Sequence, residues 1–424
     1  MKVQPKNVRV QKYVARHLSR PGYRWDKVSD PREKRGRRWK FRELMNGLFL
    51  GFVSGCPTLR AVEGMSEDMG PFGRKHISRR VPDTTLWDLT GQLSAVELRE
   101  QLICQVKGSW RAKELSPVGL PCGVVSIDGK GLGALEHDAE GTAQKTHNGQ
   151  GYEYFLARSL RAVLTSAEGR PCLDQMPIGA KTNEMGDFGK FFHRLVESYG
   201  DNNDLFEIVT TDAGMTSLAN ANRIHEANKA YVMALKGPQP ELLAEAERLL
   251  GTLRKPAVET PKERYQGTWV RRRLFRTDEI AGYHGWAHLR QVWRVEQITE
   301  HDNGKIEREE RYFVTSLTTG RLTAAQNLLV VRGHWRIECD CFGTLDLQWA
   351  EDSVPWCSRG VAVEVLSWLR LMAYNLLQLA RRRHLRRKLF NGSIEAAPDW
   401  RRLFEWVKQA WLLPVPAKEA PVCG

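Results

Sequence analysis

Apolar residues recur at helical spacing along much of residues 31–115, so this part of the chain is predicted to be helical. The first helix is expected around Phe41–Val53, where basic residues lead into an amphipathic run. Thr58 is a suitable N-cap for a second helix, and a third is expected to begin near Asp83. We therefore predict a helical domain over residues 31–115 and a basic arm over residues 1–30 before it.

The pattern changes after residue 116, where short apolar runs alternate with amphipathic stretches. These runs predict three strands, then a helix, a strand, a second helix and a further strand, which is an α/β arrangement. Residues 116–238 are accordingly assigned to the first part of an α/β domain. Two of the predicted strands end on an aspartate, in the runs "VSIDGK" and "VTTDAG".

A second change occurs in residues 239–318, where strand-like runs follow a helical stretch. We interpret this segment as a β-rich insertion, one strand of which carries three arginines in succession at 271–273. Helical periodicity returns over residues 319–390, which are predicted to form the second part of the α/β domain. Residues 391–424 are predicted to form a C-terminal tail.

The composition adds a strong positive charge to this outline. The chain has 424 residues, with 64 Lys and Arg against 50 Asp and Glu, which gives a formal net charge of +14. Such a balance favours a polyanionic partner, although it is also found in ribosomal and membrane-surface proteins. The basic segment before the first helix is of a kind that contacts phosphates, and a solvated charged surface is the equally weighted alternative.

Cysteine usage and apolar content bear on the cellular compartment. The eight cysteines include no CxxC pair, which is typical of core thiols in a reducing compartment. Cys339 and Cys341 lie near His334, but their spacing does not match a zinc finger. No apolar run has the length of a membrane span, and the N-terminus lacks the apolar segment of a signal peptide. We therefore expect a soluble cytoplasmic protein without a membrane partner.

The two strand-ending aspartates are the first candidates for chemistry. Asp128 follows the apolar run of residues 124–127, and Asp212 follows a second such run. A strand that ends in an Asp-Gly turn is the simpler explanation for Asp128. If the two strands are neighbours, both carboxylates emerge at the same edge of the sheet and repel each other. Mg²⁺, which prefers carboxylate oxygens and keeps several waters, would remove that repulsion.

A third acid is expected from the helix that follows the insertion. Glu338 lies there among apolar residues, with Arg332 and Arg336 spaced along the same helix. A surface ion-pair network between the glutamate and these arginines is the competing interpretation. Two Mg²⁺ ions about 3.5–4 Å apart, held by the three acids, would activate a water and stabilise the leaving 3′ oxygen of a phosphodiester. Mn²⁺ is expected to substitute for Mg²⁺.

Six runs of sequence carry a resemblance to a known family. They are "SIDGK" (126–130), "KTNEM" (181–185), "VTTDAG" (209–214), "YVMALKGPQ" (231–239), "RYFVTSL" (311–317) and "HWRIECDCFGTLDLQWAED" (334–352). In this order they resemble the insertion-sequence DDE transposases of the H-repeat-associated group, over roughly residues 35–380. The resemblance implies an α/β fold with a ribonuclease H-like mixed sheet and flanking helices, interrupted by a β-rich insertion, plus an N-terminal helical domain. It also implies that the catalytic, metal-binding triad is Asp128, Asp212 and Glu338.

The chain departs from the wider superfamily around its last acid. His334 stands four residues before Glu338, where an arginine is usual, and no lysine follows six or seven residues after that glutamate. Arg332 and Arg336 would then supply the phosphate contacts. The segment after Lys130 also lacks the usual arginine-serine pair.

The resemblance implies a DNA transposase that cleaves the 3′ ends of an insertion sequence and joins them to target DNA. Its partners would be double-stranded DNA, at terminal inverted repeats and at target sites, and a second copy of the chain when two ends are paired. The helical domain of residues 31–115 would be the DNA-binding domain that contacts the inverted repeats. The residues predicted to contact DNA are Arg35, Arg37, Arg38, Lys40, Lys130, Lys236, Arg271, Arg272, Arg273, Arg332 and Arg336. A DNA-binding protein that no longer transposes and a ribonuclease H-like nuclease that cuts without joining are the two alternatives. We expect a cytoplasmic, nucleoid-associated protein.

Overall fold

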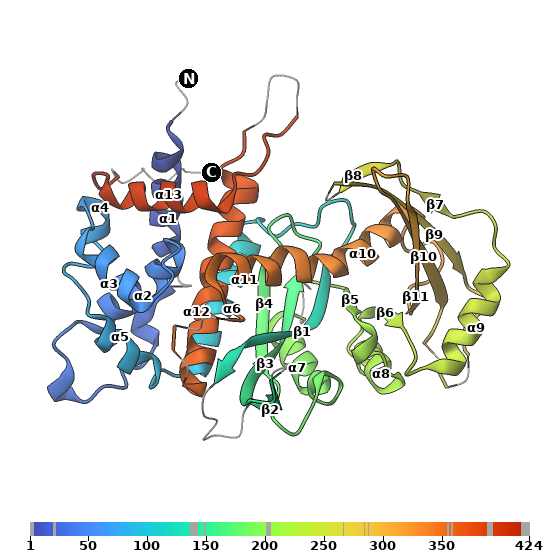
Figure 1. Cartoon of the computed structure of the whole chain (residues 1–424), viewed down its shortest axis with the longest axis horizontal. Helices are drawn as coiled ribbons and strands as arrows, with labels where there is room; N and C mark the ends of the chain where they lie inside the picture. The colour runs from blue at the N-terminus through green and yellow to red at the C-terminus, as the bar shows by residue number, and fades with distance from the viewer. Residues whose placement is uncertain are drawn as a thin grey trace.

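Helices flank one long mixed sheet in the computed structural model shown in Figure 1. The structure describes residues 4–19, 23–135, 143–147, 150–200, 205–265, 267–283, 285–286, 288–353, 356–357, 359–387 and 393–416. The N-terminal helices lie on one side of the molecule, the aspartate-bearing strands lie in the middle, and the strands of the insertion lie on the other side (Figure 1).

Five strands form the part of the sheet that carries the aspartates. β1 (Val124–Leu135) pairs antiparallel with β3 (Glu153–Leu164), which in turn pairs antiparallel with β4 (Cys172–Pro177). On its other side β1 pairs parallel with β5 (Ile208–Thr211), and β5 pairs parallel with β6 (Ala230–Leu235). Three antiparallel strands followed by two parallel strands are the ribonuclease H-like arrangement, which confirms the fold predicted from the sequence.

The predicted β-rich segment extends the same sheet. β11 (Ile306–Thr315) pairs antiparallel with β6, and β10 (Gln291–Glu300) and β9 (Thr268–Thr277) continue this pairing outward. A helix, α9 (Pro240–Gly251), connects β6 to these strands. The remaining short strands are β7 (Val258–Glu259) and β8 (Glu263–Tyr265), which pair with β9, and β2 (Gln144–His147), which pairs with β3.

Helices that precede and follow the insertion pack on the sheet. α7 (Glu184–Tyr199) packs against β3 and β4, and α8 (Leu218–Glu226) packs against β6. α10 (Ala324–Arg336) packs against β1 and β5 and continues without a break into a π-helical segment, Ile337–Phe342. The helices that follow are α11 (Gly343–Trp349) and α12 (Gly360–Leu379), and α12 ends in a second π-helical turn, Ala380–His384.

The length and composition of α12 would suit a membrane span, but its surroundings are protein. The helix and its π-helical turn, Gly360–His384, have a mean hydropathy of 1.2 over their most apolar window, and 83% of that window is buried inside the molecule. α12 contacts α2 and α6 on one side and β1 and β4 on the other. It therefore forms the core between the N-terminal helices and the sheet (Figure 1).

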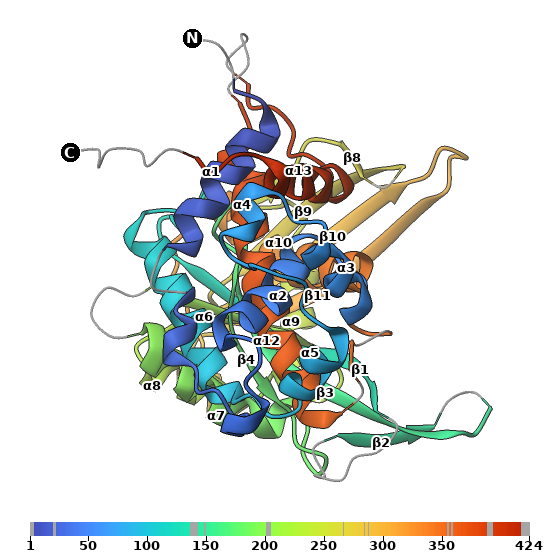
Figure 2. The same ribbon diagram turned by 90° about the vertical axis from the view of Figure 1, so that its left-hand side faces the viewer.

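Residues 6–18 form a packed helix inside the segment that the sequence predicted to be a basic arm. In α1 (Lys6–Leu18), Val10, Tyr13 and Val14 share one face and are buried. This face packs against α13 (Trp400–Leu412), a helix inside the segment that was predicted to be a tail. Figure 2 shows the two helices side by side at the top of the molecule. The basic composition of this segment hid a short apolar stripe that helices distant in sequence cover, because Tyr13 also contacts the C-terminal end of α12 and His384 beyond it.

The predicted helical segment over residues 31–115 is helical in the structure. The predicted cap at Thr58 is present, since its side chain accepts a hydrogen bond from the Ala61 N–H. The helix expected near Asp83 begins there without a side-chain cap, and Ser94, which was not predicted, caps the next helix by accepting a hydrogen bond from the Glu97 N–H. The helices are α2 (Phe41–Val53), α3 (Leu59–Glu67), α4 (Pro71–Arg74), α5 (Asp83–Thr90) and α6 (Ala95–Arg111).

A buried ionic network joins β3 to α12 beside the strand that carries Asp128. Arg161 lies opposite Asp128 in the β1–β3 pairing, and its Nη1 lies 2.7 Å from Oε2 of Glu351. The Arg370 Nη1 lies 3.0 Å from Oε1 of the same carboxylate. Burial alone would raise the pKa of Glu351, but the two guanidinium groups outweigh that effect and hold its pKa at about 2.

Replacing Glu351 with Gln should strongly destabilise the protein. The substitution leaves Arg161 and Arg370 buried without a counter-charge, and breaking such a pair costs about 3–5 kcal/mol. Urea denaturation would measure this as a fall in the free energy of unfolding. Glu245→Gln, at an exposed pair with Arg248, is the matched control and should change stability little. Equal stability of the two variants would contradict the role given to the network.

Candidate functional site

The two aspartates lie side by side at one edge of the sheet. In the parallel pairing of β1 with β5, Ile127 lies opposite Thr211, so Asp128 and Asp212 follow at the same level. Asp128 Oδ1 accepts a hydrogen bond of 2.8 Å from the Gly129 N–H. Asp212 Oδ1 accepts one of 3.2 Å from the Met215 N–H, which fixes the turn after β5. The strands are thus neighbours, as the sequence interpretation required.

A carboxylate that the sequence analysis did not select joins them. Glu184 is the first residue of α7, and ligand oxygens of Asp128, Glu184 and Asp212 all lie within 4.8 Å of one another. The helix begins at Asn183, whose side chain accepts a hydrogen bond from the Gly186 N–H. The run "KTNEM" at 181–185 contains both residues and was the one available signal, but an acid in a first helical turn is ordinary in any protein.

The third predicted acid, Glu338, lies in the π-helical segment after α10. Its side chain is exposed, and its charge is close enough to raise the pKa of Asp128. Asp212 and Glu338 line a common pocket of about 530 Å³, together with Lys236. Single-turn π segments are frequent at functional sites, because the extra residue redirects a side chain. The helix that carries Glu338 thus places it beside the two strand ends.

The raised pKa values of two acids show that the fold brings carboxylates close together despite their mutual repulsion. Burial, followed by the charge of Asp212, raises the pKa of Asp128 to about 8, while the Gly129 N–H opposes the shift. Burial and Asp212 also raise the pKa of Glu184. A hard divalent cation among these oxygens would offset the repulsion that both shifts report.

His334 lies behind the acids and belongs to the sheet core. Its Nδ1 lies 2.9 Å from the Thr210 hydroxyl, which in turn donates to the Ser126 hydroxyl at 2.8 Å. Burial lowers the pKa of His334 to about 4, so the ring is neutral at physiological pH. The imidazole therefore supports β5 and takes no part in a zinc site with the nearby cysteines, of which Cys341 is fully buried.

The arginines near Glu338 pair with other acids. Nη2 of Arg332 lies 2.7 Å from Oε1 of Glu263, and Nη1 of Arg336 lies 3.7 Å from Oδ2 of Asp340. The competing interpretation, in which the two arginines neutralise Glu338, therefore does not describe the structure. Glu338 keeps its carboxylate exposed toward the pocket that it shares with Asp212.

Several cations predicted to contact DNA are also engaged in ion pairs. Arg271 and Arg273 both pair with Glu259, at 2.8 and 2.9 Å, and Arg272 pairs with Glu263 at 2.6 Å. Lys130 pairs with Asp346, and Arg37 pairs with Asp30 at 3.3 Å. Among the described residues, Lys236, Arg35, Arg38 and Lys40 are exposed without a carboxylate partner.

Comparison with known proteins identifies the family. The family model of the transposase DDE domain matches residues 122–376, more than half of the chain and a range that includes all four acids. The chain belongs to the DDE transposase family. No curated protein matches it. Among solved structures, the cryo-EM structure of a piggyBac transposase synaptic complex with hairpin DNA is similar, with 11% sequence identity and a TM-score of 0.44, over 97% of this chain and 80% of that chain.

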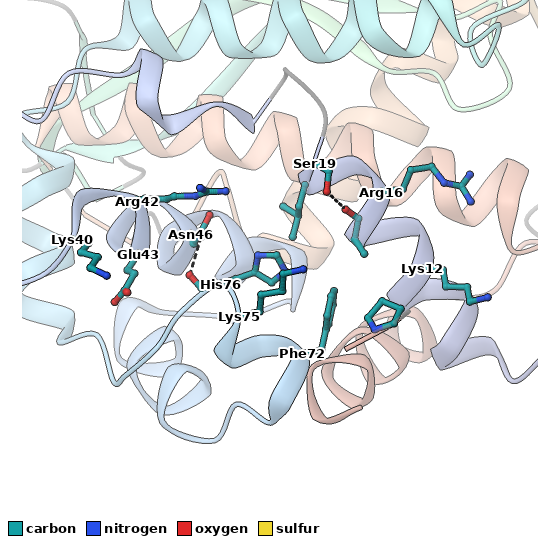
Figure 3. Close-up of a pocket in the computed structure, with 13 residues that line it drawn as sticks. Lys12, Arg16, Ser19, Lys40, Arg42, Glu43, Asn46, Phe72, Lys75 and His76 are labelled. Atoms are coloured by element: carbon teal, nitrogen blue, oxygen red, sulfur yellow. Dashed lines mark hydrogen bonds between the residues drawn. The ribbon is translucent and has the colours of Figure 1, made fainter. Parts of the chain in front are cut away.

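The transposase has a second concave feature, a basic pocket among its N-terminal helices (Figure 3). The pocket has a volume of about 820 Å³ and is lined by α1, the start of α2 and the end of α4. Glu43 is the one carboxylate among its lining residues, and it accepts a hydrogen bond from Ser78. The basic residues that line the pocket are Lys12, Arg16, Lys40, Arg42 and Lys75.

Several residues that line the pocket are held in place by contacts with the rest of the protein. The Asn46 side chain donates to the His76 carbonyl at 2.8 Å and accepts from Trp25 Nε1 at 2.9 Å. Phe72 stacks on Trp411 of α13, with ring centroids 5.4 Å apart. Burial, followed by the charges of Lys75 and Arg42, lowers the pKa of His76 to about 4. The pocket therefore concentrates positive charge at fixed positions.

Removing one acid of the cluster should stabilise the metal-free transposase. The folded protein keeps a proton on Asp128 up to about pH 8, whereas the unfolded chain loses it near the ordinary pKa of 3.8. The folded state thus binds more protons over this window, and wild-type stability falls as the pH rises. Asp128→Asn removes that titration, so its advantage in Tm should grow from about pH 4 to about pH 8.

Thermal denaturation in the presence of EDTA would measure the advantage of Asp128→Asn. Asp68→Asn, at an exposed position, controls for the general effect of losing a carboxylate. An advantage that stays constant between pH 4 and pH 8 would show that Asp128 titrates normally.

Proposed function

We propose that this transposase cleaves the 3′ ends of its element and joins them to target DNA at the site formed by Asp128, Asp212 and Glu338. One observation carries the proposal: Asp128 and Asp212 end neighbouring strands at one edge of the sheet, and Glu338, whose charge acts on Asp128, lines a pocket together with Asp212. The proposal adds Mg²⁺ as the cofactor, bound as two ions, with Mn²⁺ as a substitute.

The donor set fits that cofactor. All the ligand atoms are carboxylate oxygens, which hard divalent cations prefer, and the pocket beside Asp212 and Glu338 leaves room for a phosphate. When bound, the ions would supply an activated water and charge stabilisation at the scissile phosphate. Asp128 would contribute to both ion positions, because the charges of Asp212, Glu338 and Glu184 all act on it. Lys236 would orient the phosphate from the pocket wall.

The partner proposed for this site is double-stranded DNA. The net charge of +14 and the basic pocket of Figure 3 both favour a polyanion. We further propose that the protein acts in the cytoplasm on terminal inverted repeats and target DNA, and that two copies assemble when two ends are paired.

Asp128→Asn, Asp212→Asn and Glu338→Gln should each abolish Mg²⁺-dependent cleavage and leave DNA binding within about twofold of wild type. Metal ligation and phosphate contacts are separate, so an isosteric amide removes the first and spares the second. Nicking of DNA that carries the element's ends measures cleavage, and a gel-shift assay measures binding. Cleavage that persists in all three variants would remove the triad assignment.

Strand transfer needs its own measurement. Pre-cleaved ends with a free 3′-OH, incubated with a plasmid target and Mg²⁺, should be joined by the wild-type protein. Nicking without joining would instead identify a nuclease, and binding without either reaction would identify a DNA-binding protein that no longer transposes.

The cations of the basic pocket should contribute more to DNA binding than the arginines of the insertion. Lys40, Arg42 and Lys75 form no ion pair with any described residue, whereas the three arginines at 271–273 are each held in an ion pair with Glu259 or Glu263. Lys40→Ala, Arg42→Ala and Lys75→Ala combined should weaken binding about tenfold and lower the salt slope by about 3.

A 40-base-pair duplex titrated at several salt concentrations would measure both effects. The alanine triple at 271–273 is the comparison, and Lys190→Ala, Arg254→Ala and Lys255→Ala combined control for the loss of three exposed charges. A pocket variant that binds like this control would show that the pocket does not face DNA.

A further inference from the structure

The fourth acid at the sheet edge has a role that the DDE triad does not include. We infer that Glu184 is a direct ligand of a divalent cation held between it, Asp128 and Asp212, so that the metal centre has four carboxylates. The inference rests on the proposed function, because it concerns the composition of the same centre. A residue of α7 would thus help to bind one of the ions.

Geometry groups Glu184, rather than the predicted glutamate, with both aspartates. Oxygens of Asp128, Glu184 and Asp212 lie within 4.8 Å of one another, and Glu338 does not belong to this group among the described residues. One cation among three carboxylates at this spacing satisfies all of them. Glu338, on its exposed π-helical segment, is then left to complete the second position beside the phosphate pocket.

The backbone of Glu184 is fixed by its own helix. Asn183 caps α7, and Asp187 in the next turn accepts a hydrogen bond of 3.2 Å from the Gly179 N–H. Phe188 and Phe191, on the following turn, are fully buried. The first turn of α7 is therefore held against the sheet, and Glu184 reaches Asp128 from a rigid position.

No hydrogen bond or ion pair from the described residues holds the Glu184 carboxylate, although it is half-buried beside two aspartates. Arg158 is the cation whose charge it feels, and the Arg158 guanidinium instead donates to the Thr182 carbonyl at 3.4 Å. A half-buried acid among acids is unfavourable unless a cation joins it.

Gly129 makes the space that Glu184 occupies. A Cβ at position 129 would overlap the Glu184 carboxylate, with Oε1 the nearest atom. Gly129 has no positive φ, so its backbone does not require glycine. Gly131, two residues along the same strand, provides a contrast, because a Cβ there would meet nothing closer than 3.9 Å, at Leu156. The absent side chain at 129 thus allows the carboxylate to approach Asp128.

Metal titration of the DNA-free protein tests the inference without reference to activity. Isothermal titration with MnCl₂ should show that Glu184→Gln weakens the tighter binding event about tenfold or more, since a ligand is lost. Glu197→Gln is the matched control: it lies on the same helix, where it is exposed and paired with His193 at 3.2 Å, and should bind Mn²⁺ like wild type.

Gly129→Ala tests the same contact from the other side. It leaves every acid in place but pushes the Glu184 carboxylate away, so it should weaken Mn²⁺ binding as Glu184→Gln does. Gly131→Ala should not change it. Combining Gly129→Ala with Glu184→Gln should add little to either change, because both remove one ligand.

The outcomes separate this inference from the proposed function. Asp128→Asn, titrated in parallel, reports on the metal centre as a whole. If Asp128→Asn loses Mn²⁺ affinity and Glu184→Gln does not, the fourth ligand is refuted and the triad stands. If neither variant differs from wild type, both are refuted. Mn²⁺ binding that is weakened in both, with Glu197→Gln unchanged, supports both.

Discussion

The parallel pairing of β1 with β5 is the constraint on which the site depends. It sets Ile127 opposite Thr211, and this register brings two aspartates from distant parts of the chain to the same level. A shift of one residue would turn one of them to the other face of the sheet. α7 and the π-helical segment after α10 then add a glutamate each around a position that the strands have already defined.

This convergence has an energetic cost that the rest of the fold offsets. The raised pKa of Asp128 and of Glu184 shows that the folded protein resists ionising the acids that it gathers. Next to them, Arg161, Glu351 and Arg370 form a buried network that ties the neighbouring strand to the central helix α12. A rigid frame of this kind keeps the carboxylates close when no cation is present, so the centre is preorganised for one.

Local patterns predicted the strand ends, and tertiary contacts decided the rest. Asp128 and Asp212 could be selected because an acid at the end of a buried apolar run stands out in the sequence. Glu184 could not, because an acid in the first turn of a helix also suits the helix dipole. The packing of α1 against α13 joins the two ends of the chain, which no local window contains. The ion pairs between the glutamates of β7 and β8 and the arginines of β9 likewise depend on strand pairing that a local window of sequence does not show.

The net charge of the chain therefore does not show which of its cations are available to bind a partner. On the insertion, arginines of β9 form ion pairs with glutamates of neighbouring strands, so part of the positive charge there is offset within the sheet. Around the N-terminal pocket, cations from three separate segments line one cavity, and Lys40, Arg42 and Lys75 among them form no ion pair with a described residue. Electrostatic attraction to a phosphate chain follows the uncompensated charge rather than the count of basic residues. For the proposed function, this distribution favours a first contact of DNA with the helical side of the molecule. The acids at the sheet edge repel phosphate, and in the proposed reaction they would accept it only with a cation bound.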